Sequence, residues 1–94
     1  MTIQVRSVHS IAKILSGRKI YVELPDPSTL HGLLKELTKT CGKEFYDAVC
    51  NETGYPAEKV AILVNGTSAA VHGGAIVQLK DGDDVLILPV ISGG

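Results

Sequence analysis

Residues 60–66 read VAILVNG, five apolar residues followed by Asn65-Gly66. A continuous apolar run of this length, bounded by turn residues, is typical of a buried β-strand. Asn-Gly is the strongest short signal for a hairpin turn. We therefore expect a strand over residues 60–64, a tight turn with positive φ at Asn65 and Gly66, and a return strand over Thr67–Val71.

Further strands are expected on both sides of this hairpin. Downstream, Asp81-Gly82-Asp83 predicts a turn, and the apolar residues 85–88 predict a last strand. Upstream, apolar and polar residues alternate over residues 3–8 and again over 19–24, which predicts a hairpin of two half-buried strands. Pro25 ends the second of these strands, because proline cannot donate to the ladder.

One long helix is expected between the two hairpins. Ser28 or Thr29 can cap its first turn, and Gly42 is suited to end it. Four leucines at i, i+3, i+4 and i+7 share one face, namely Leu30, Leu33, Leu34 and Leu37. Residues 43–54 allow a short second helix ending at Gly54. The element order predicts an α+β fold of the β-grasp type, with a mixed sheet and the main helix across one face.

The composition describes one small domain spanning residues 1–94. Formal net charge is -1, and the nine Lys and Arg are scattered and balanced by ten acids. This balance, with only 4% aromatic residues, argues against nucleic-acid binding. No apolar run approaches the ~18 residues that span a bilayer, and no signal peptide is recognisable. We expect a cytoplasmic protein without a membrane partner, in which Cys41 and Cys50 are reduced thiols.

Conventional catalytic and metal-binding patterns are missing from the sequence. The three histidines have no Cys or His at zinc-type spacing. Cys41 and Cys50 are interpreted as small buried hydrophobes rather than catalytic thiols. The acids around Gly82 lack the calcium-loop pattern, and Gly73-Gly74 lacks the Lys and Ser/Thr of a phosphate-binding loop. We therefore expect no metal site, no bound cofactor and no catalytic site of the chain's own.

A surplus of apolar residues on the strands indicates a binding surface instead. Residues 60–64 and 85–88 are apolar at every position, yet alternate side chains of a strand point away from the helix. Some of these outward side chains should form an exposed apolar patch of the kind that marks a protein interface. The candidates are Ala61, Leu63, Leu86, Leu88, Val90 and Ile91. The alternative is that the loop at residues 43–57 covers them.

The final segment, Pro89-Val90-Ile91-Ser92-Gly93-Gly94, is the second unusual feature. Two glycines lack Cβ atoms, which makes this tail at about residues 90–94 thin and conformationally free. Fully extended, the segment from Pro89 to Gly94 reaches up to about 18–20 Å. Such a tail can pass through a narrow channel and deliver its carboxylate to a distant active site. The alternative is an ordinary frayed terminus.

Taken together, these segments resemble the MoaD/ThiS family of ubiquitin-like sulfur carriers. The shared pattern is an apolar strand ending in Asn65-Gly66, a turn Asp81-Gly82-Asp83, a strand running into Pro89, and a final Gly93-Gly94. The N-terminal half matches more loosely, so the resemblance spans nearly the whole chain. The extended segment near residues 40–58 and the position of Pro89 favour the molybdopterin synthase small subunit, MoaD. The family often has two adjacent prolines where this chain has Pro89-Val90.

The resemblance implies a carrier that acts within a molybdopterin synthase complex. A ubiquitin-activating-type enzyme uses ATP to adenylate the Gly94 carboxylate, and a persulfide then supplies sulfur to give a Gly94 thiocarboxylate next to Gly93. The carrier docks on a larger, MoaE-like subunit. The expected docking residues are Leu63, Leu86, Leu88, Pro89, Val90, Ile91 and Ser92.

Three alternatives to this function remain open. One is a ThiS-like carrier for thiamine or another sulfur pathway. Another is a ubiquitin-like modifier conjugated to other proteins through Gly94, because the same tail serves both chemistries. The third is an interaction domain whose tail is idle.

Overall fold

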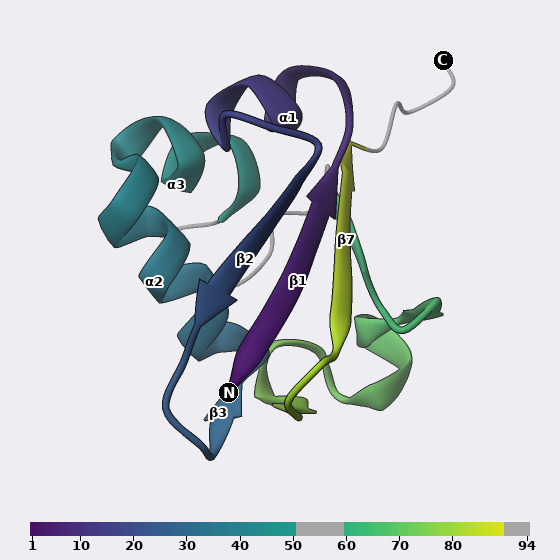
Figure 1. The fold of residues 1–94 in the computed structure, drawn as a ribbon. Coiled ribbons are helices and arrows are strands. Elements are labelled where there is room, and N and C mark those ends of the chain that lie inside the picture. The colour runs from purple at the N-terminus through teal and green to yellow at the C-terminus, as the bar shows by residue number, and fades with distance from the viewer. Residues whose placement is uncertain (51–59, 90–94) are drawn as a thin grey trace.

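A five-stranded mixed sheet with its helices on one face forms the framework of the molecule (Figure 1). The computed structural model describes residues 1–50 and 60–89, so the predicted tail at 90–94 lies outside the described residues. The elements follow in the order β1 (Thr2–Ser7), α1 (His9–Ile14), β2 (Lys19–Glu23), β3 (Ser28–Thr29), α2 (Leu30–Cys41), α3 (Lys43–Val49), β4 (Val60–Val64), β5 (Thr67–Ser68), η1 (Ala69–His72), η2 (Gly74–Ile76), β6 (Gln78–Leu79) and β7 (Asp84–Pro89).

The first and last strands lie side by side at the centre of the sheet. The strand order is β2-β1-β7-β4-β5. β1 and β7 are parallel, with Ser7 opposite Ile87, whereas the β1–β2, β4–β7 and β4–β5 pairs are antiparallel. This is the mixed sheet of a β-grasp, so the fold class predicted from the sequence is confirmed.

The main helix packs its leucine face against the central strands, as predicted. Thr29 caps α2 by accepting a hydrogen bond from the amide of Gly32 at 3.3 Å, and Gly42, with φ +86°, ends it. Each leucine side chain is at most 1% exposed, which is worth about 1.5–3 kcal/mol of burial per residue. The four are Leu30, Leu33, Leu34 and Leu37. They share one core with inward residues of the central strands, namely Ile3, Val5, Val85 and Ile87.

The hairpin turn at Asn65-Gly66 is also confirmed. Asn65 has φ 52° and Gly66 has φ 84°, as the type I′ turn of a two-residue loop requires. Val64 pairs with Thr67 directly across this turn. The turn fixes the register between β4 and β5.

The predicted return strand, Thr67–Val71, is wrong beyond Ser68. The chain leaves the sheet at Ala69, whose side chain is buried, and continues as two short 3₁₀ turns. Gly73 connects these turns with φ +105°, a conformation that strongly favours glycine. Burial of Ala69 therefore takes the chain out of the sheet after Ser68, against the strand pattern of the sequence.

Two further differences concern short elements. The second helix ends at Val49, after which Cys50 is extended, so the expected extension to Gly54 is wrong at Cys50, and Gly54 lies outside the described residues. A two-stranded sheet of β3 and β6 was not predicted. Each of its strands has only two residues, too few to show a period in the sequence.

Candidate docking face and carrier tail

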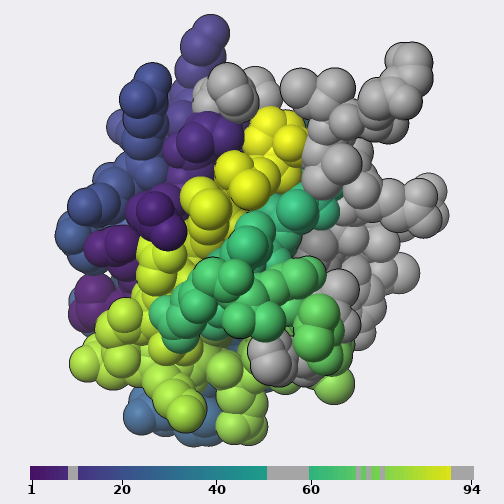
Figure 2. All heavy atoms as spheres, turned by 90° about the vertical axis from the view of Figure 1, so that its right-hand side faces the viewer, coloured from purple at the N-terminus to yellow at the C-terminus, as the bar shows by residue number. Residues whose placement is uncertain are grey.

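The sheet presents a face opposite the helices, which we call the outer face. Alternate residues of β1, β4 and β7 point to it, while most of their neighbours are buried against the helices; in β2 the neighbours, Ile20 and Val22, are only half-buried. Figure 2 shows this face, with side chains of β1 in purple, β7 in yellow and β4 in teal across it. The outward residues are Lys19, Tyr21 and Glu23 of β2, Thr2, Gln4 and Arg6 of β1, Asp84, Leu86 and Leu88 of β7, and Ala61 and Leu63 of β4.

The apolar residues of the outer face lie together on β4 and β7. The register places Leu86 opposite Leu63 and Leu88 opposite Ala61. Side chains directly opposite on one face of a sheet are in contact range. We call these four residues the apolar patch. All four are half-buried rather than fully exposed. The structure thus brings Leu63, Leu86 and Leu88 onto one surface, and their role in docking stays a prediction.

Residues 43–50 begin the segment that was considered as a cover for the apolar patch, and they lie on the opposite, helix-bearing side of the sheet. α3 contacts α1 and α2 on the helix-bearing side, and its Phe45 and Val49 are buried in the core. Residues 43–50 therefore do not cover the apolar patch. The remainder of that loop, residues 51–57, lies outside the part of the chain that the structure describes.

Next to the apolar patch, Asp84 holds a compact polar cluster. Its Oδ1 accepts hydrogen bonds from Gln4 Nε2 at 2.7 Å and Arg6 Nε at 2.8 Å, and its Oδ2 accepts from an Arg6 terminal nitrogen at 2.6 Å. The hydrogen bond from Arg6 lowers the pKa of Asp84 below its usual value, and Asp84 raises the pKa of Arg6. The two charges satisfy each other, so the centre of the outer face carries little net charge.

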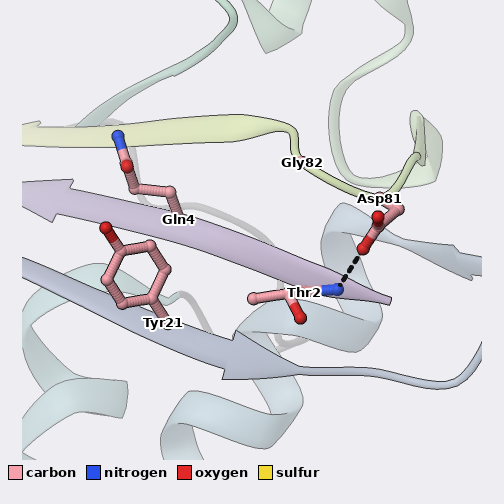
Figure 3. A pocket seen from close by; sticks show the side chains of 5 residues that line it. All are labelled: Thr2, Gln4, Tyr21, Asp81 and Gly82. Carbon is pink, nitrogen blue, oxygen red and sulfur yellow. Dashed lines mark hydrogen bonds between the residues drawn. The ribbon is translucent and has the colours of Figure 1, made fainter.

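A shallow hollow lies at the far, polar end of the outer face (Figure 3). It is lined by Thr2, Gln4, Tyr21, Asp81 and Gly82. The backbone amide of Thr2 donates to Asp81 Oδ1 at 2.7 Å, so the only carboxylate in this lining is already bound. The described residues contain no cluster of three metal-ligating side chains here or elsewhere.

β7 carries the chain from the polar cluster to the tail. Pro89 pairs with Val60 at the end of the sheet where β1 also ends (Figure 1). It directly follows Leu88 of the apolar patch, and it is half-buried. The remaining predicted site residues, Val90, Ile91, Ser92, Gly93 and Gly94, lie outside the described residues. The segment that leads to them starts beside the apolar patch.

Asn65 positions β7 through contacts that sequence reasoning missed. Its side-chain Oδ1 accepts from the backbone amide of Asp84, and its Nδ2 donates to Asp83 Oδ1, both at 2.9 Å. Its backbone amide donates to the carbonyl of Asp84 at 2.7 Å. The Asn-Gly signal predicted only the local turn. The one clue to the wider role was the choice of Asn, whose amide can both donate and accept.

Neither cysteine resembles an activated thiol. Cys50 is buried and Cys41 is half-buried, and both are free thiols. Burial raises the pKa of each, and a hydrogen bond with Thr38 only partly offsets this for Cys50. A raised pKa leaves less of the reactive thiolate at neutral pH. The structure therefore supports the interpretation of both as small core residues.

Comparison with known proteins identifies the family. The model described as the ThiS family matches residues 10–94. The chain belongs to the ThiS family. It is thus one of the small ubiquitin-like sulfur carriers, whose β-grasp fold it shares.

Solved structures support the ThiS-family assignment. Urm1 from Trypanosoma brucei is 28% identical, with a TM-score of 0.80, and the match covers 99% of this chain and 95% of that one. A putative molybdopterin converting factor, subunit 1, from Pyrococcus furiosus is 25% identical, with a TM-score of 0.77 and coverage of 97% and 99%. SAMP1 from Haloferax volcanii, at 18% identity, has a TM-score of 0.82 with full coverage of both chains, and this likeness shows the fold.

No curated protein matches the sequence of this ThiS-family chain. In residues 1–50 and 60–89, no helix has the length and apolar character needed to cross a membrane.

Proposed function

We propose that this ThiS-family protein is the sulfur-carrying small subunit of a molybdopterin synthase. The observation that carries the sulfur-carrier function is the family match, which extends from residue 10 through Gly94. The position of β7 supports it, because this strand leads from the apolar patch directly into the segment that ends in Gly93-Gly94. The likeness to the Pyrococcus furiosus molybdopterin converting factor supports the choice of pathway.

The chemistry is expected at the Gly94 carboxylate. A C-terminal carboxylate has a pKa of about 3.3–3.7, so at neutral pH it is ionised and unreactive toward nucleophiles. A ubiquitin-activating-type enzyme would transfer AMP from ATP to this carboxylate, releasing pyrophosphate and leaving an electrophilic acyl adenylate. A persulfide would then displace AMP, and a thiol would cleave the resulting acyl disulfide. The product is a Gly94 thiocarboxylate, a nucleophile that serves as the sulfur donor.

The apolar patch is the expected docking surface for the larger, MoaE-like subunit. Leu86 and Leu88 lie on the strand that runs into Pro89, so a partner that covers them would also receive the start of the tail. From Pro89 the chain reaches up to about 18–20 Å when extended, far enough to enter an active site beside the interface. Val90, Ile91 and Ser92 would line the entry to that site, and Gly93 would pass its narrowest part. The carrier itself binds no cofactor in this scheme, and it works in the cytoplasm.

Mass measurement of the intact protein tests the proposal. The protein is incubated with its activating enzyme, ATP and a persulfide donor, and we expect the mass change of one sulfur replacing one oxygen. Deletion of Gly94, or Gly93→Val, should abolish this change while the fold is kept. Cys41→Ser serves as the matched control and should accept sulfur normally. Sulfur uptake by the Gly94-deleted protein would contradict the proposal.

The downstream pathway needs a second measurement. Thiocarboxylated protein mixed with the MoaE-like subunit and the sulfur-free pterin precursor should yield molybdopterin. A protein that gains the thiocarboxylate but gives no molybdopterin would instead serve thiamine synthesis or another sulfur pathway. Gly-Gly remnants on lysines of other proteins would reveal the modifier function that the same tail permits.

A further inference from the structure

The two edges of the sheet differ in how well they are protected. The β5 edge is a strand of two residues, after which the chain turns away. The β2 edge has five residues, Lys19–Glu23, and among the described residues it pairs only with β1. Figure 1 looks onto this edge, and no described element covers it. Unpaired backbone groups on such an edge are a template for another strand.

The hydrogen-bond pattern shows which backbone groups of β2 are free. Ser7 donates to the carbonyl of Arg18 at 2.9 Å, and Leu24 donates to the carbonyl of Met1 at 2.9 Å. Bonded and non-bonded pairs alternate along an antiparallel ladder. Ile20 and Val22 therefore direct their amides and carbonyls toward β1. The amides and carbonyls of the three alternating residues, Lys19, Tyr21 and Glu23, point toward the open edge.

The sequence of this edge complements itself. We propose that a second copy of this chain pairs antiparallel with β2, centred on Tyr21, so that the sheet continues across a two-fold axis. In this register Lys19 lies opposite Glu23 of the second copy, and Glu23 lies opposite its Lys19. Two opposite-charge pairs result, and directly opposed charges of this kind stabilise paired strands. A two-fold symmetric contact uses the same patch on both copies, as most homodimers do.

The same register satisfies the free backbone groups. Lys19, Tyr21 and Glu23 all carry outward-directed amides and carbonyls, and in this register each faces another member of the set. A shift by one residue would place these amides and carbonyls opposite Ile20 and Val22 of the second copy, whose own amides and carbonyls already bond to β1. It would also turn the second copy over, so that its inner-face side chains would join the outer face of the first copy. A shift by two residues would keep some backbone bonds but lose both charge pairs. The centred register alone satisfies both requirements.

The side chains fit the same contact on both faces. Tyr21 is 65% exposed, far more than is usual for a large aromatic side chain on a strand of the core. On the outer face it would meet Tyr21 of the second copy. On the inner face Ile20 would lie opposite Val22, and both are at present only partly buried against the core. The contact thus covers apolar surface on each side. Glu23 accepts a hydrogen bond from the Thr2 hydroxyl and keeps further lone pairs for Lys19 of the second copy.

The proposed contact leaves the apolar patch free. The strand order places β1 between β2 and β7, so the patch on β4 and β7 lies away from the dimer edge. A dimer through β2 would therefore present two patches at the outer ends of one continuous sheet. The contact uses only residues of β2, so it does not depend on which sulfur pathway the protein serves.

Sedimentation velocity of the full chain, from micromolar concentration to about 1 mM, tests the proposal. The interface is small, and we expect a dissociation constant between about 1 μM and about 1 mM. Lys19→Glu places two like-charge pairs across the axis, and so does Glu23→Lys. Each should raise the dissociation constant by about tenfold or more, because attraction is replaced by repulsion at two sites.

A mixture of the two variants is the decisive control. In a Lys19→Glu and Glu23→Lys heterodimer both opposed pairs again carry opposite charges, so mixing two weakly associating proteins should restore dimers. Amide exchange at Lys19, Tyr21 and Glu23 should slow in the wild-type protein as its concentration rises, and circular dichroism confirms that the variants are folded. A wild-type monomer at about 1 mM, variants that dimerise like the wild type, or a mixture that stays monomeric would each overturn the proposal.

Discussion

Replacement of Asn65 tests how the hairpin turn is coupled to the strand that leads to the tail. Asn65 stabilises the structure in two separable ways. Its backbone has φ 52°, a left-handed conformation that costs most L-residues about 1–2 kcal/mol. Its side chain makes two hydrogen bonds, to the amide of Asp84 and to the carboxylate of Asp83. Asn65→Gly removes only the side-chain bonds, whereas Asn65→Ala also forces alanine into the left-handed conformation.

The two contributions predict an order of stabilities. Each hydrogen bond contributes about 0.5–1.5 kcal/mol, and both are exposed, so the pair is worth about 1 kcal/mol at the low end of that range. Asn65→Gly should therefore lower the free energy of unfolding by about 1 kcal/mol. Asn65→Ala should lower it by about 2–3 kcal/mol, because the backbone term adds to the first. Gly66→Ala is the matched control for the backbone term, since an added Cβ there meets no atom within 4 Å.

Urea denaturation measures these differences, provided that the slope with denaturant is unchanged between variants. If Asn65→Ala is no less stable than Asn65→Gly, the left-handed conformation does not matter and the backbone argument is refuted. If Asn65→Gly is as stable as the wild type, the contacts with Asp83 and Asp84 contribute nothing, and Asn65 does not hold the start of β7.

Three more predictions concern the core, the polar cluster and the docking surface. Leu34→Ala, at a fully buried position, should lower stability by about 2–5 kcal/mol in the same denaturation assay, and a loss below about 0.5 kcal/mol would contradict the packing. The ion pair with Arg6 lowers the pKa of Asp84, so the stability that this pair contributes is fully present above the ordinary carboxyl pKa of about 3.9 and is lost as the pH falls through the lowered pKa. Asp84→Asn should remove at most about 1 kcal/mol of this acid-dependent stability, measured as the free energy of unfolding over a pH series. Identical pH profiles of the variant and the wild type would refute the pairing. Leu88→Asp should weaken binding to the MoaE-like subunit at least tenfold, as measured by calorimetry. Ile76→Asp, at an exposed position outside the sheet, should leave the affinity unchanged. Equal losses of affinity would argue against the apolar patch as the docking surface.

The elements that the sequence predicted well are those with a local physical cause. The leucine face of α2 follows from side-chain spacing, and the turn at Asn65-Gly66 follows from the backbone freedom of two residues. Gly42 ends α2 for the same local reason. Each of these signals lies within a few residues, so no knowledge of the remaining chain is needed to interpret it.

The features that were missed depend on contacts between distant segments. Asp84 meets Gln4 and Arg6 only because β1 and β7 pair in parallel, and 78 or 80 positions separate these residues in the sequence. The short β3–β6 pair arises from the same kind of long-range contact. The return strand was predicted too long because Ala69 gains burial by leaving the sheet. Of the residues predicted to form an exposed apolar patch, Ala61, Leu63, Leu86 and Leu88 share the outer face but are half-buried, and Val90 and Ile91 lie outside the described residues.

The pairing of β1 with β7 has a consequence for synthesis in the cell. The two central neighbours of the sheet are far apart in the sequence, so β1 gains its second partner only after the chain has been made as far as β7. Closing so long a loop is an entropic barrier, and proteins rich in such distant pairings fold slowly. A nascent chain interrupted before Asp84 lacks β7, the partner of both β1 and β4, so its core is not closed. A closed core therefore forms only in chains that include β7, the strand that precedes the tail, and chains without it would be exposed to proteases.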